Sequence, residues 1–366
     1  MTKSISYKSL LFCLALVRPG DALAWLFLKN GVLLVKILPL REKRMDGVRF
    51  PEGVLEARQR IEPEVFHTPL TASAGLSRLC HGEVRLKWEN KQVTGSFKFR
   101  GALNRLRTLS PEERAKGVIS ASTGNHGLAL SWACQLEEVS LLLFVPKNAA
   151  AEKFRRLAEA GATVIRYEGS CEAAEIYGRQ LASEEGKVFI SPYNDAEIIH
   201  GQGTIGSEIL EDWPEVEAVF VPVGGGGLIS GIAGLMKSLK PAVRILGVEP
   251  ENSAFMTASL RAGQITQIEE KETLAEAVAG GLEPGAITLE LCSKYVDGMI
   301  TVSEERIRQA MDLIYLEHGR MVEGAGALAL AGLLSQAKDF EGRRIALVVS
   351  GGNVSPELFS HLGVKT

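Results

Sequence analysis

The sequence predicts an α/β protein made of two interwoven domains, each an open and mostly parallel sheet wrapped by helices. Three observations lead to this class. From Val84 onward, short runs rich in β-branched residues alternate with amphipathic segments, which is typical of parallel sheets covered by helices. The 366 residues are 46% apolar, enough for two sizeable cores. No repeat or proline-rich linker divides the chain, so the domains are expected to be interwoven.

Strand-like and helix-like segments alternate along the chain in a definite order. The expected strands are Val84–Trp88, Val118–Ala121, Leu141–Val145, Thr163–Tyr167, Val188–Ile190, Ala218–Val223, Arg244–Val248, Gly298–Val302 and Arg343–Val349. The expected helices include Leu128–Leu136, Ala151–Ala160, Ile229–Leu239 and Glu305–Glu317. Gly161, Gly186 and Gly342 stand where helix C-terminal caps or turns are expected.

The first part of the chain departs from this pattern. Residues 1–44 form an atypical apolar N-terminal extension, but charged residues and prolines interrupt it. No stretch reaches the roughly 18 uninterrupted apolar residues of a membrane span. We expect residues 45–116 together with 194–366 to form a large domain, with residues 117–193 inserted in it as a small domain.

Charge and cysteine usage exclude several kinds of protein. A formal net charge of −3, without any run of Lys or Arg, argues against a nucleic-acid-binding surface. The five cysteines are scattered, with no C-x-x-C pair and no histidine at ligand spacing. We therefore expect buried thiols in a reducing, cytoplasmic compartment.

Four consecutive glycines follow an expected strand and open an expected helix. Gly224–Gly227 would let successive backbone N–H groups converge on one anion without obstruction by Cβ atoms, and the helix dipole would add to the attraction. In either register of a G-x-G-x-x-G dinucleotide motif, Ile229 or Ser230 takes the place of the third glycine. The run favours a monophosphate site, with a turn that binds no ligand as the alternative.

Two further polar turns precede expected helices. Residues 120–127 gather hydroxyls, an amide and free N–H groups, which is typical of a carboxylate receptor, although N-capping by Ser122 or Thr123 would also explain them. Lys98 lies between two aromatic residues at an expected helix start. An apolar surround would lower its pKa and make it a better amine nucleophile, whereas a lone lysine is most often a solvated charge.

Together these turns resemble those of a known family. Four motifs stand in the order found in fold-type II enzymes that depend on pyridoxal 5′-phosphate (PLP): Ser96–Gly101 (SFKFRG), Ser122–Gly127 (STGNHG), Gly224–Gly227 and Ser350–Asn353 (SGGN). The chain is most similar to the group of serine/threonine dehydratases and serine racemases, from about residue 66 to residue 353. The resemblance implies the fold-type II architecture, a PLP cofactor and a homodimer.

The resemblance also implies a role for each cofactor-binding residue. Lys98 would carry the cofactor as a Schiff base and remove the proton from the substrate Cα. Phe97 would pack on the pyridine ring, Asn125 would hydrogen-bond its 3′-oxygen, and Ser350 would face its nitrogen. The phosphate would be bound by the backbone N–H groups of Gly224, Gly225, Gly226, Gly227 and Leu228.

The substrate carboxylate would lie, by the same resemblance, among Ser122, Thr123 and His126. Thr123 is also a catalytic candidate, because it stands where racemases of the group place the serine that reprotonates Cα. Its extra methyl restricts the side-chain rotamer, and many dehydratases place alanine there. This departure weakens the case for racemisation.

A second departure concerns metal binding. The segment Glu249–Phe255 resembles the metal loop of the racemase-like members, but Phe255 replaces the expected second carboxylate. A divalent ion prefers several oxygen ligands with carboxylates among them. We therefore expect no metal site, with Glu249 as the remaining candidate ligand.

The implied activity is that of a PLP-dependent lyase, an ammonia-lyase that converts L-threonine or L-serine to a 2-keto acid and ammonia. A hydroxyl at Ser350 would not hold the pyridine nitrogen protonated, and the weaker electron sink would favour loss of the β-hydroxyl. The alternatives are a serine racemase, a β-replacement enzyme of the sulfhydrylase type and a non-catalytic PLP-binding protein. Another is a dehydratase for a specialised substrate, namely hydroxyaspartate, phenylserine or a product of compatible-solute breakdown.

Overall fold

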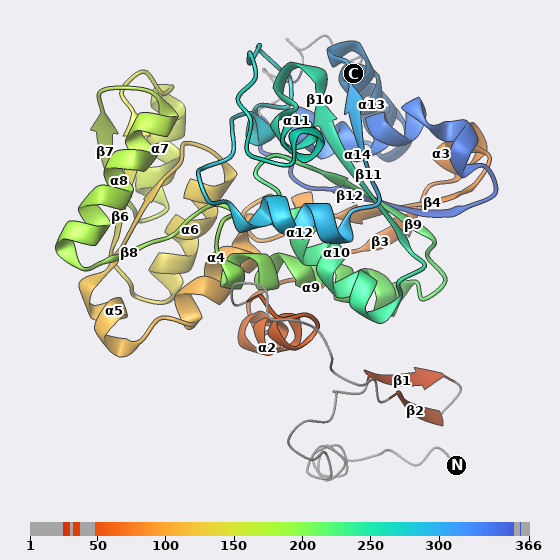
Figure 1. Cartoon of the computed structure of the whole chain (residues 1–366), viewed down its shortest axis with the longest axis horizontal. Coiled ribbons are helices and arrows are strands. Elements are labelled where there is room, and N and C mark those ends of the chain that lie inside the picture. The colour runs from red at the N-terminus through yellow and green to blue at the C-terminus, as the bar shows by residue number, and fades with distance from the viewer. Residues whose placement is uncertain (1–24, 30–31, 37–47, 355–358, 360–366) are drawn as a thin grey trace.

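The computed structural model describes residues 25–29, 32–36, 48–354 and 359 of the chain (Figure 1). Most of the predicted N-terminal extension therefore lies outside the described residues. Its described part is an antiparallel pair of strands, β1 (Trp25–Lys29) and β2 (Val32–Lys36). No helix among the described residues is long and apolar enough to cross a lipid bilayer.

The larger of the two main sheets has six strands in the order β11-β10-β9-β12-β4-β3. Its strands are β3 (Leu70–Ala72), β4 (Glu83–Trp88), β9 (Ala218–Pro222), β10 (Arg244–Pro250), β11 (Gly298–Val302) and β12 (Arg344–Val349). All neighbours pair in parallel except the edge strand β3, which is antiparallel to β4. Every residue of β9 is buried, as expected for a central strand covered by helices on both faces.

Helices cover the six-stranded sheet on both faces. Phe220 of β9 packs in one apolar cluster with α13 (Glu304–His318) and α14 (Gly324–Ser335). Its neighbours Val219 and Val221 pack in a second cluster with α9 (Ala196–Asp212) and α10 (Gly227–Leu239). Helix α14 is buried along most of its length, because its residues are apolar on every side. The helices outside the smaller sheet are α2 (Glu52–Ile61), α3 (Ala74–Cys80), α4 (Lys98–Arg107), α5 (Pro111–Lys116), α9 (Ala196–Asp212), α10 (Gly227–Leu239), α11 (Phe255–Ala262), α12 (Ile287–Tyr295), α13 (Glu304–His318) and α14 (Gly324–Ser335).

The smaller sheet has four parallel strands in the order β7-β6-β5-β8 and occupies the left of Figure 1. Its strands are β5 (Val118–Ala121), β6 (Leu141–Pro146), β7 (Thr163–Tyr167) and β8 (Val188–Phe189). Three helices follow its strands, namely α6 (Asn125–Leu136), α7 (Ala151–Glu159) and α8 (Cys171–Glu185). Short 3₁₀ turns elsewhere are η1 (Glu89–Lys91), η2 (Glu251–Ser253), η3 (Glu276–Val278) and η4 (Ala337–Phe340).

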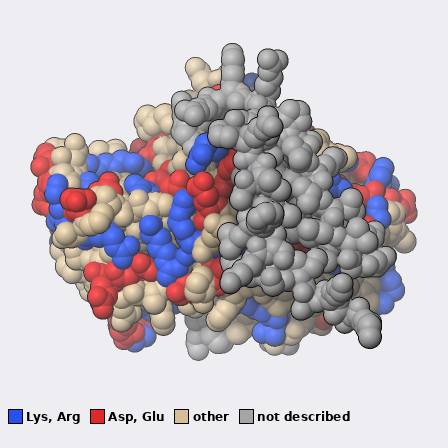
Figure 2. Space-filling view, turned by 90° about the horizontal axis from the view of Figure 1, so that it is seen from below, with Lys and Arg blue, Asp and Glu red and all other residues tan. Residues whose placement is uncertain are grey.

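The predicted α/β class with mostly parallel sheets is confirmed. Each expected strand is present with ends that differ by two residues at most, whereas β1, β2 and β3 were not predicted. Gly186 ends α8 in the left-handed conformation, and Gly161 and Gly342 also have positive φ, as their predicted turns require. The division into a large and a small domain stays a prediction. On the face drawn in Figure 2, Lys and Arg are interspersed with Asp and Glu wherever described residues are visible.

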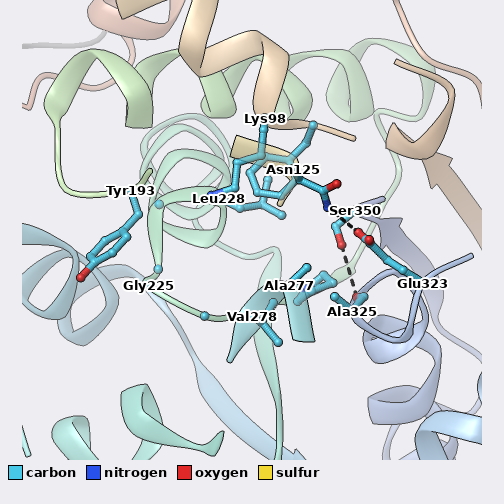
Figure 3. Close-up of a pocket in the computed structure, with 15 residues that line it drawn as sticks. Lys98, Asn125, Tyr193, Gly225, Leu228, Ala277, Val278, Glu323, Ala325 and Ser350 are labelled. Carbon is cyan, nitrogen blue, oxygen red and sulfur yellow. Dashed lines mark hydrogen bonds between the residues drawn. The ribbon is translucent and has the colours of Figure 1, made fainter. Parts of the chain in front are cut away.

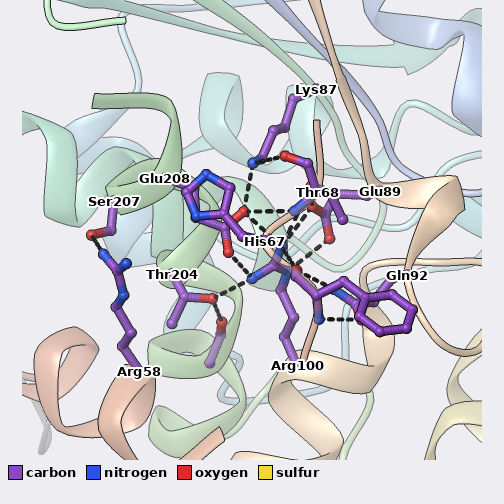
Figure 4. Close-up of polar contacts among 12 residues, drawn as sticks. Arg58, His67, Thr68, Lys87, Glu89, Gln92, Arg100, Thr204, Ser207 and Glu208 are labelled. Atoms are coloured by element: carbon purple, nitrogen blue, oxygen red, sulfur yellow. Dashed lines mark hydrogen bonds and ion pairs between the residues drawn. The ribbon is translucent and has the colours of Figure 1, made fainter. Parts of the chain in front are cut away.

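A buried ionic network joins four elements, β4, η1, α4 and α9 (Figure 4). Arg100 of α4 pairs through Nε with Glu89 Oε2 at 2.7 Å and through Nη1 with Glu208 Oε1 of α9 at 2.6 Å. Lys87 of β4 pairs with the other oxygen of Glu208 at 2.5 Å, and its Nζ also donates to the Thr68 carbonyl. Burial works to raise the pKa of Glu208, but the charges of Arg100 and Lys87 outweigh it and hold that pKa below its ordinary value.

Two cations and two carboxylates therefore balance one another inside the protein, where an unpaired charge would be costly. We predict that Arg100→Met lowers the free energy of unfolding by about 3–5 kcal/mol, because it leaves two buried carboxylates with one cation. Urea unfolding followed by circular dichroism measures this change. Lys147→Ala, which removes an exposed ion pair with Glu168, serves as the control and should leave stability unchanged. Equal stability of Arg100→Met and the wild type would contradict the prediction.

Candidate functional site

A pocket lies where parallel strands end and helices begin, the usual ligand site of an open α/β sheet. Figure 3 shows its lining residues converging from several segments. The lining residues are Phe97, Lys98, Asn125, Tyr193, Pro222, Gly224, Gly225, Gly226, Gly227, Leu228, Ala277, Val278, Glu323, Ala325 and Ser350.

Lys98 is the first residue of α4, and its amine is enclosed by protein although the residue keeps some exposure to the pocket. Nζ donates a hydrogen bond to the Pro192 carbonyl at 2.9 Å and lies 5.1 Å from the centre of the Phe97 ring. Within residues 48–354, Nζ forms no ion pair with a carboxylate. Burial lowers the pKa of Lys98 to about 8, so the neutral form of this amine is far more populated near physiological pH than in a solvated lysine.

The glycine run forms the opposite wall of the pocket. Gly226 takes the left-handed conformation (φ 86°) and caps α10 without any side-chain hydrogen bond to the helix start. The first N–H groups of α10 therefore remain available to an anion. A Cβ on Gly225 would lie 2.3 Å from the Tyr193 ring, so this glycine is also needed for packing.

Asn125, the first residue of α6, carries an amide that is held at both ends. Its Nδ2 donates to Glu323 Oε1 at 2.6 Å, and its Oδ1 accepts from Asn353 Nδ2 at 2.7 Å. Burial raises the pKa of Glu323 to about 7. Ser350 Oγ donates to the Ala325 carbonyl at 3.2 Å, while the Ser350 carbonyl accepts from the Phe97 N–H, which ties the SGGN and SFKFRG motifs together.

The predicted carboxylate receptor lies at the start of α6, next to Asn125. Gly124, rather than Ser122 or Thr123, is the N-cap, and no side chain caps the helix. Ser122 Oγ instead accepts from the Gly124 N–H at 3.3 Å. The N-terminal amides of α6 are thus available to a ligand, and the alternative of simple N-capping by a hydroxyl does not describe this turn.

His126 lies deeper than the other residues of this turn. Its Nε2 is 3.2 Å from Ser120 Oγ and 3.3 Å from the Ile190 carbonyl oxygen. Burial, helped by the nearby Lys98 charge, lowers the pKa of His126 to about 3, so the ring is neutral. His126 is buried and anchored to β5 and the end of β8, and its predicted contact with a substrate stays a prediction.

Both carboxylate oxygens of Glu249, the candidate metal ligand, accept hydrogen bonds from the start of α11. Oε1 accepts from the Met256 N–H and Oε2 from the Thr257 N–H, each at 2.8 Å. Burial raises the pKa of Glu249 to about 7. Among residues 48–354, no group of three or more His, Cys, Asp or Glu side chains could hold a metal ion.

The structure brings together the residues predicted to bind the cofactor, since Phe97, Lys98, Asn125, the glycine run, Leu228 and Ser350 all line one pocket. The residues predicted for the substrate, Ser122, Thr123 and His126, do not line it but belong to the adjoining turn. Sequence reasoning missed Tyr193, Ala277, Val278, Glu323 and Ala325. No local pattern in the sequence marked any of these five residues as part of a site.

The lowered pKa of Lys98 leads to a kinetic prediction. Only a neutral amine attacks a carbonyl, so capture of an aldehyde ligand by this residue should accelerate about tenfold per pH unit and level off near pH 8. Stopped-flow absorbance of the ligand-free protein mixed with pyridoxal phosphate measures this rate. A rate that keeps rising to pH 10, as for a solvated lysine, would contradict the assignment.

Comparison with known proteins gave consistent matches. The family model described as "Pyridoxal-phosphate dependent enzyme" matches residues 61–351. The chain is 43% identical over 312 residues to L-threonine ammonia-lyase of Thermotoga maritima, covering 85% of this chain and 77% of that one. It is 39% identical over 305 residues to the catabolic L-threonine dehydratase of Escherichia coli, covering 83% and 92%. The structure of maize serine racemase superposes with a TM-score of 0.79 at 34% identity, covering 86% of this chain and 98% of that one.

Proposed function

Because the chain belongs to the family of pyridoxal-phosphate dependent enzymes, we propose that it is an ammonia-lyase that converts a β-hydroxy amino acid, such as L-threonine or L-serine, to a 2-keto acid and ammonia. The observation that carries this proposal is the enclosed amine of Lys98, whose pKa burial lowers to about 8, facing a glycine-lined anion cradle in one pocket. An amine nucleophile and a phosphate cradle together are what this cofactor requires.

The residues that line the pocket fit the phosphate and the ring of pyridoxal phosphate. The uncapped start of α10, with Gly226 in a conformation that favours glycine, suits the phosphate. Phe97 and the amide of Asn125 lie beside Lys98, where they would hold the ring. When bound, pyridoxal phosphate supplies an aldehyde for an amine and a ring that withdraws electrons from the substrate Cα.

The protein's own contribution to the reaction is positioning and proton transfer. Lys98 would take the proton from the substrate Cα, and its lowered pKa lets it alternate between the neutral and the charged form near pH 8. Ser350 presents a neutral hydroxyl, which does not hold a ring nitrogen protonated and so favours prompt loss of the β-hydroxyl.

The substrate carboxylate would bind at the start of α6. Uncapped backbone amides and the helix dipole attract an anion there, and the Ser122 and Thr123 hydroxyls stand half-buried beside them. His126, neutral and buried behind this turn, would support it without adding charge.

We further infer a small domain of residues 117–193 within a larger one, a homodimer and a cytoplasmic location. The four-stranded sheet, which lies wholly within residues 118–189, supports the domain division. The described cysteines are all free thiols, which fits a reducing compartment.

A keto-acid assay across a panel of β-hydroxy amino acids tests the activity. We predict turnover of L-threonine or L-serine, and a loss of about 10²–10⁴-fold or more in Lys98→Ala, because that variant lacks the amine that moves the proton. Lys187→Ala, which removes a half-buried lysine that pairs with Glu185 away from the pocket, is the matched control and should keep wild-type activity. Absence of keto acid from every substrate, or full activity of Lys98→Ala, would contradict the proposal.

Serine racemisation is the second candidate, favoured by the half-buried Thr123 hydroxyl beside the carboxylate site. We predict that pyruvate outpaces D-serine when L-serine is supplied, since the Thr123 methyl restricts the hydroxyl that would reprotonate Cα. Chiral chromatography of the reaction mixture measures both products. D-serine forming ahead of pyruvate would reverse the order of the two candidates.

A further inference from the structure

The amide of Asn125 is clamped between a donor and an acceptor. Its Oδ1 accepts from Asn353 Nδ2 at 2.7 Å, and its Nδ2 donates to Glu323 Oε1 at 2.6 Å. An amide nitrogen carries two protons, so one N–H remains after Glu323 has taken the other. In Figure 3, Asn125 and Glu323 point toward each other at the edge of the pocket, joined by a dashed line.

This clamp selects one of the two ways in which the amide can face. A flip would turn Oδ1 toward the Glu323 carboxylate oxygen and Nδ2 toward the amide nitrogen of Asn353. Both new contacts would be repulsive, because one would place an acceptor against an acceptor and the other a donor against a donor. The amide therefore keeps its nitrogen on the side of Glu323.

Other parts of the structure hold Glu323 in this position. The residue is the N-cap of α14, but its side chain makes no capping bond to its own helix. A Cβ on Gly351 would lie 2.1 Å from Glu323 Oε1 and 3.1 Å from Asn125 Nδ2. The glycine after Ser350 thus leaves the space in which the carboxylate meets the amide. Asn353 is itself held, because its Nδ2 also donates to the Thr94 carbonyl and its Oδ1 accepts from Arg156.

We propose that Glu323 is a positioning residue that keeps a donor N–H of Asn125, rather than its carbonyl oxygen, directed at the ring oxygen of bound pyridoxal phosphate. The proposal rests on the cofactor-binding role proposed for Asn125 above. Glu323 acts through Asn125. An oxygen that loses this donor becomes a stronger base, so removal of Glu323 should change how the bound cofactor titrates.

The charges around Glu323 set the range in which the clamp works. Burial raises the pKa of this carboxyl to about 7, and the Glu276 charge of η3 adds to the increase. Lys153 and Arg156 of α7, together with the hydrogen bond from Asn125, oppose it. A raised carboxyl pKa means that the acceptor is ionised above pH 7 and gains a proton as the pH falls, so the clamp weakens toward acid.

The test uses the cofactor-loaded protein and its visible absorbance as a function of pH. Glu323→Met keeps the length of the side chain but replaces the carboxylate with an apolar group, which cannot take its place as a hydrogen-bond acceptor. We expect its absorbance midpoint to move up by about one pH unit, and its affinity for pyridoxal phosphate to fall about tenfold or more, as for a lost hydrogen bond to a charged group. Glu323→Gln keeps a carbonyl acceptor and should restore most of both values.

Glu217→Gln removes a carboxylate at the opposite end of the six-stranded sheet and should titrate as the wild type. A wild-type midpoint and affinity in Glu323→Met would overturn the proposal. If that variant does not fold, Asn353→Ala tests the other half of the clamp, and an unchanged midpoint there would equally overturn it. The proposed function fails separately, when the wild type gives no visible absorbance with pyridoxal phosphate or no keto acid.

Discussion

The cost of enclosing a charged amine is the constraint on which this site depends. Two enclosed lysines lie only eleven positions apart, and the protein offsets the cost of enclosing them in different ways. Lys87 is fully buried and pairs with Glu208, so its charge is balanced within the network around Arg100. Lys98 has the Pro192 carbonyl as its hydrogen-bond partner, and burial lowers its pKa to about 8. The first lysine is therefore suited to structure, and the second to nucleophilic chemistry.

One short segment of the chain carries both lysines. Strand β4 carries Lys87 and leads through η1 to α4, which begins with Lys98 and continues to Arg100. The ionic network fixes Arg100 between η1 and α9, and so fixes the start of α4 at the edge of the pocket. The ends of β9 and β12 bring the glycine run and Ser350 to the same place. Stability and function are thus adjacent in the chain, because Lys98 and Arg100 stand two residues apart at the start of α4.

Local sequence carried enough information to predict most of the fold and part of the site. The buried strands read as continuous apolar runs, and consecutive residues formed the glycine run and the Lys98 turn. The edge strand β3 was missed because three residues, two of them exposed, leave no periodic signal. Tyr193 and Glu323 were missed for another reason. They reach the pocket from loops far along the chain, and their roles come from contacts with Gly225, Asn125 and Gly351 that no local pattern encodes.

The central claim is that the amine of Lys98 is the group that bonds to the cofactor. Borohydride reduction of the protein in pyridoxal phosphate, followed by peptide mass spectrometry, tests it most directly. We expect a single stoichiometric adduct on the peptide that contains Lys98, and none on the peptide that contains Lys87. An adduct on another lysine, or no adduct at all, would contradict the account.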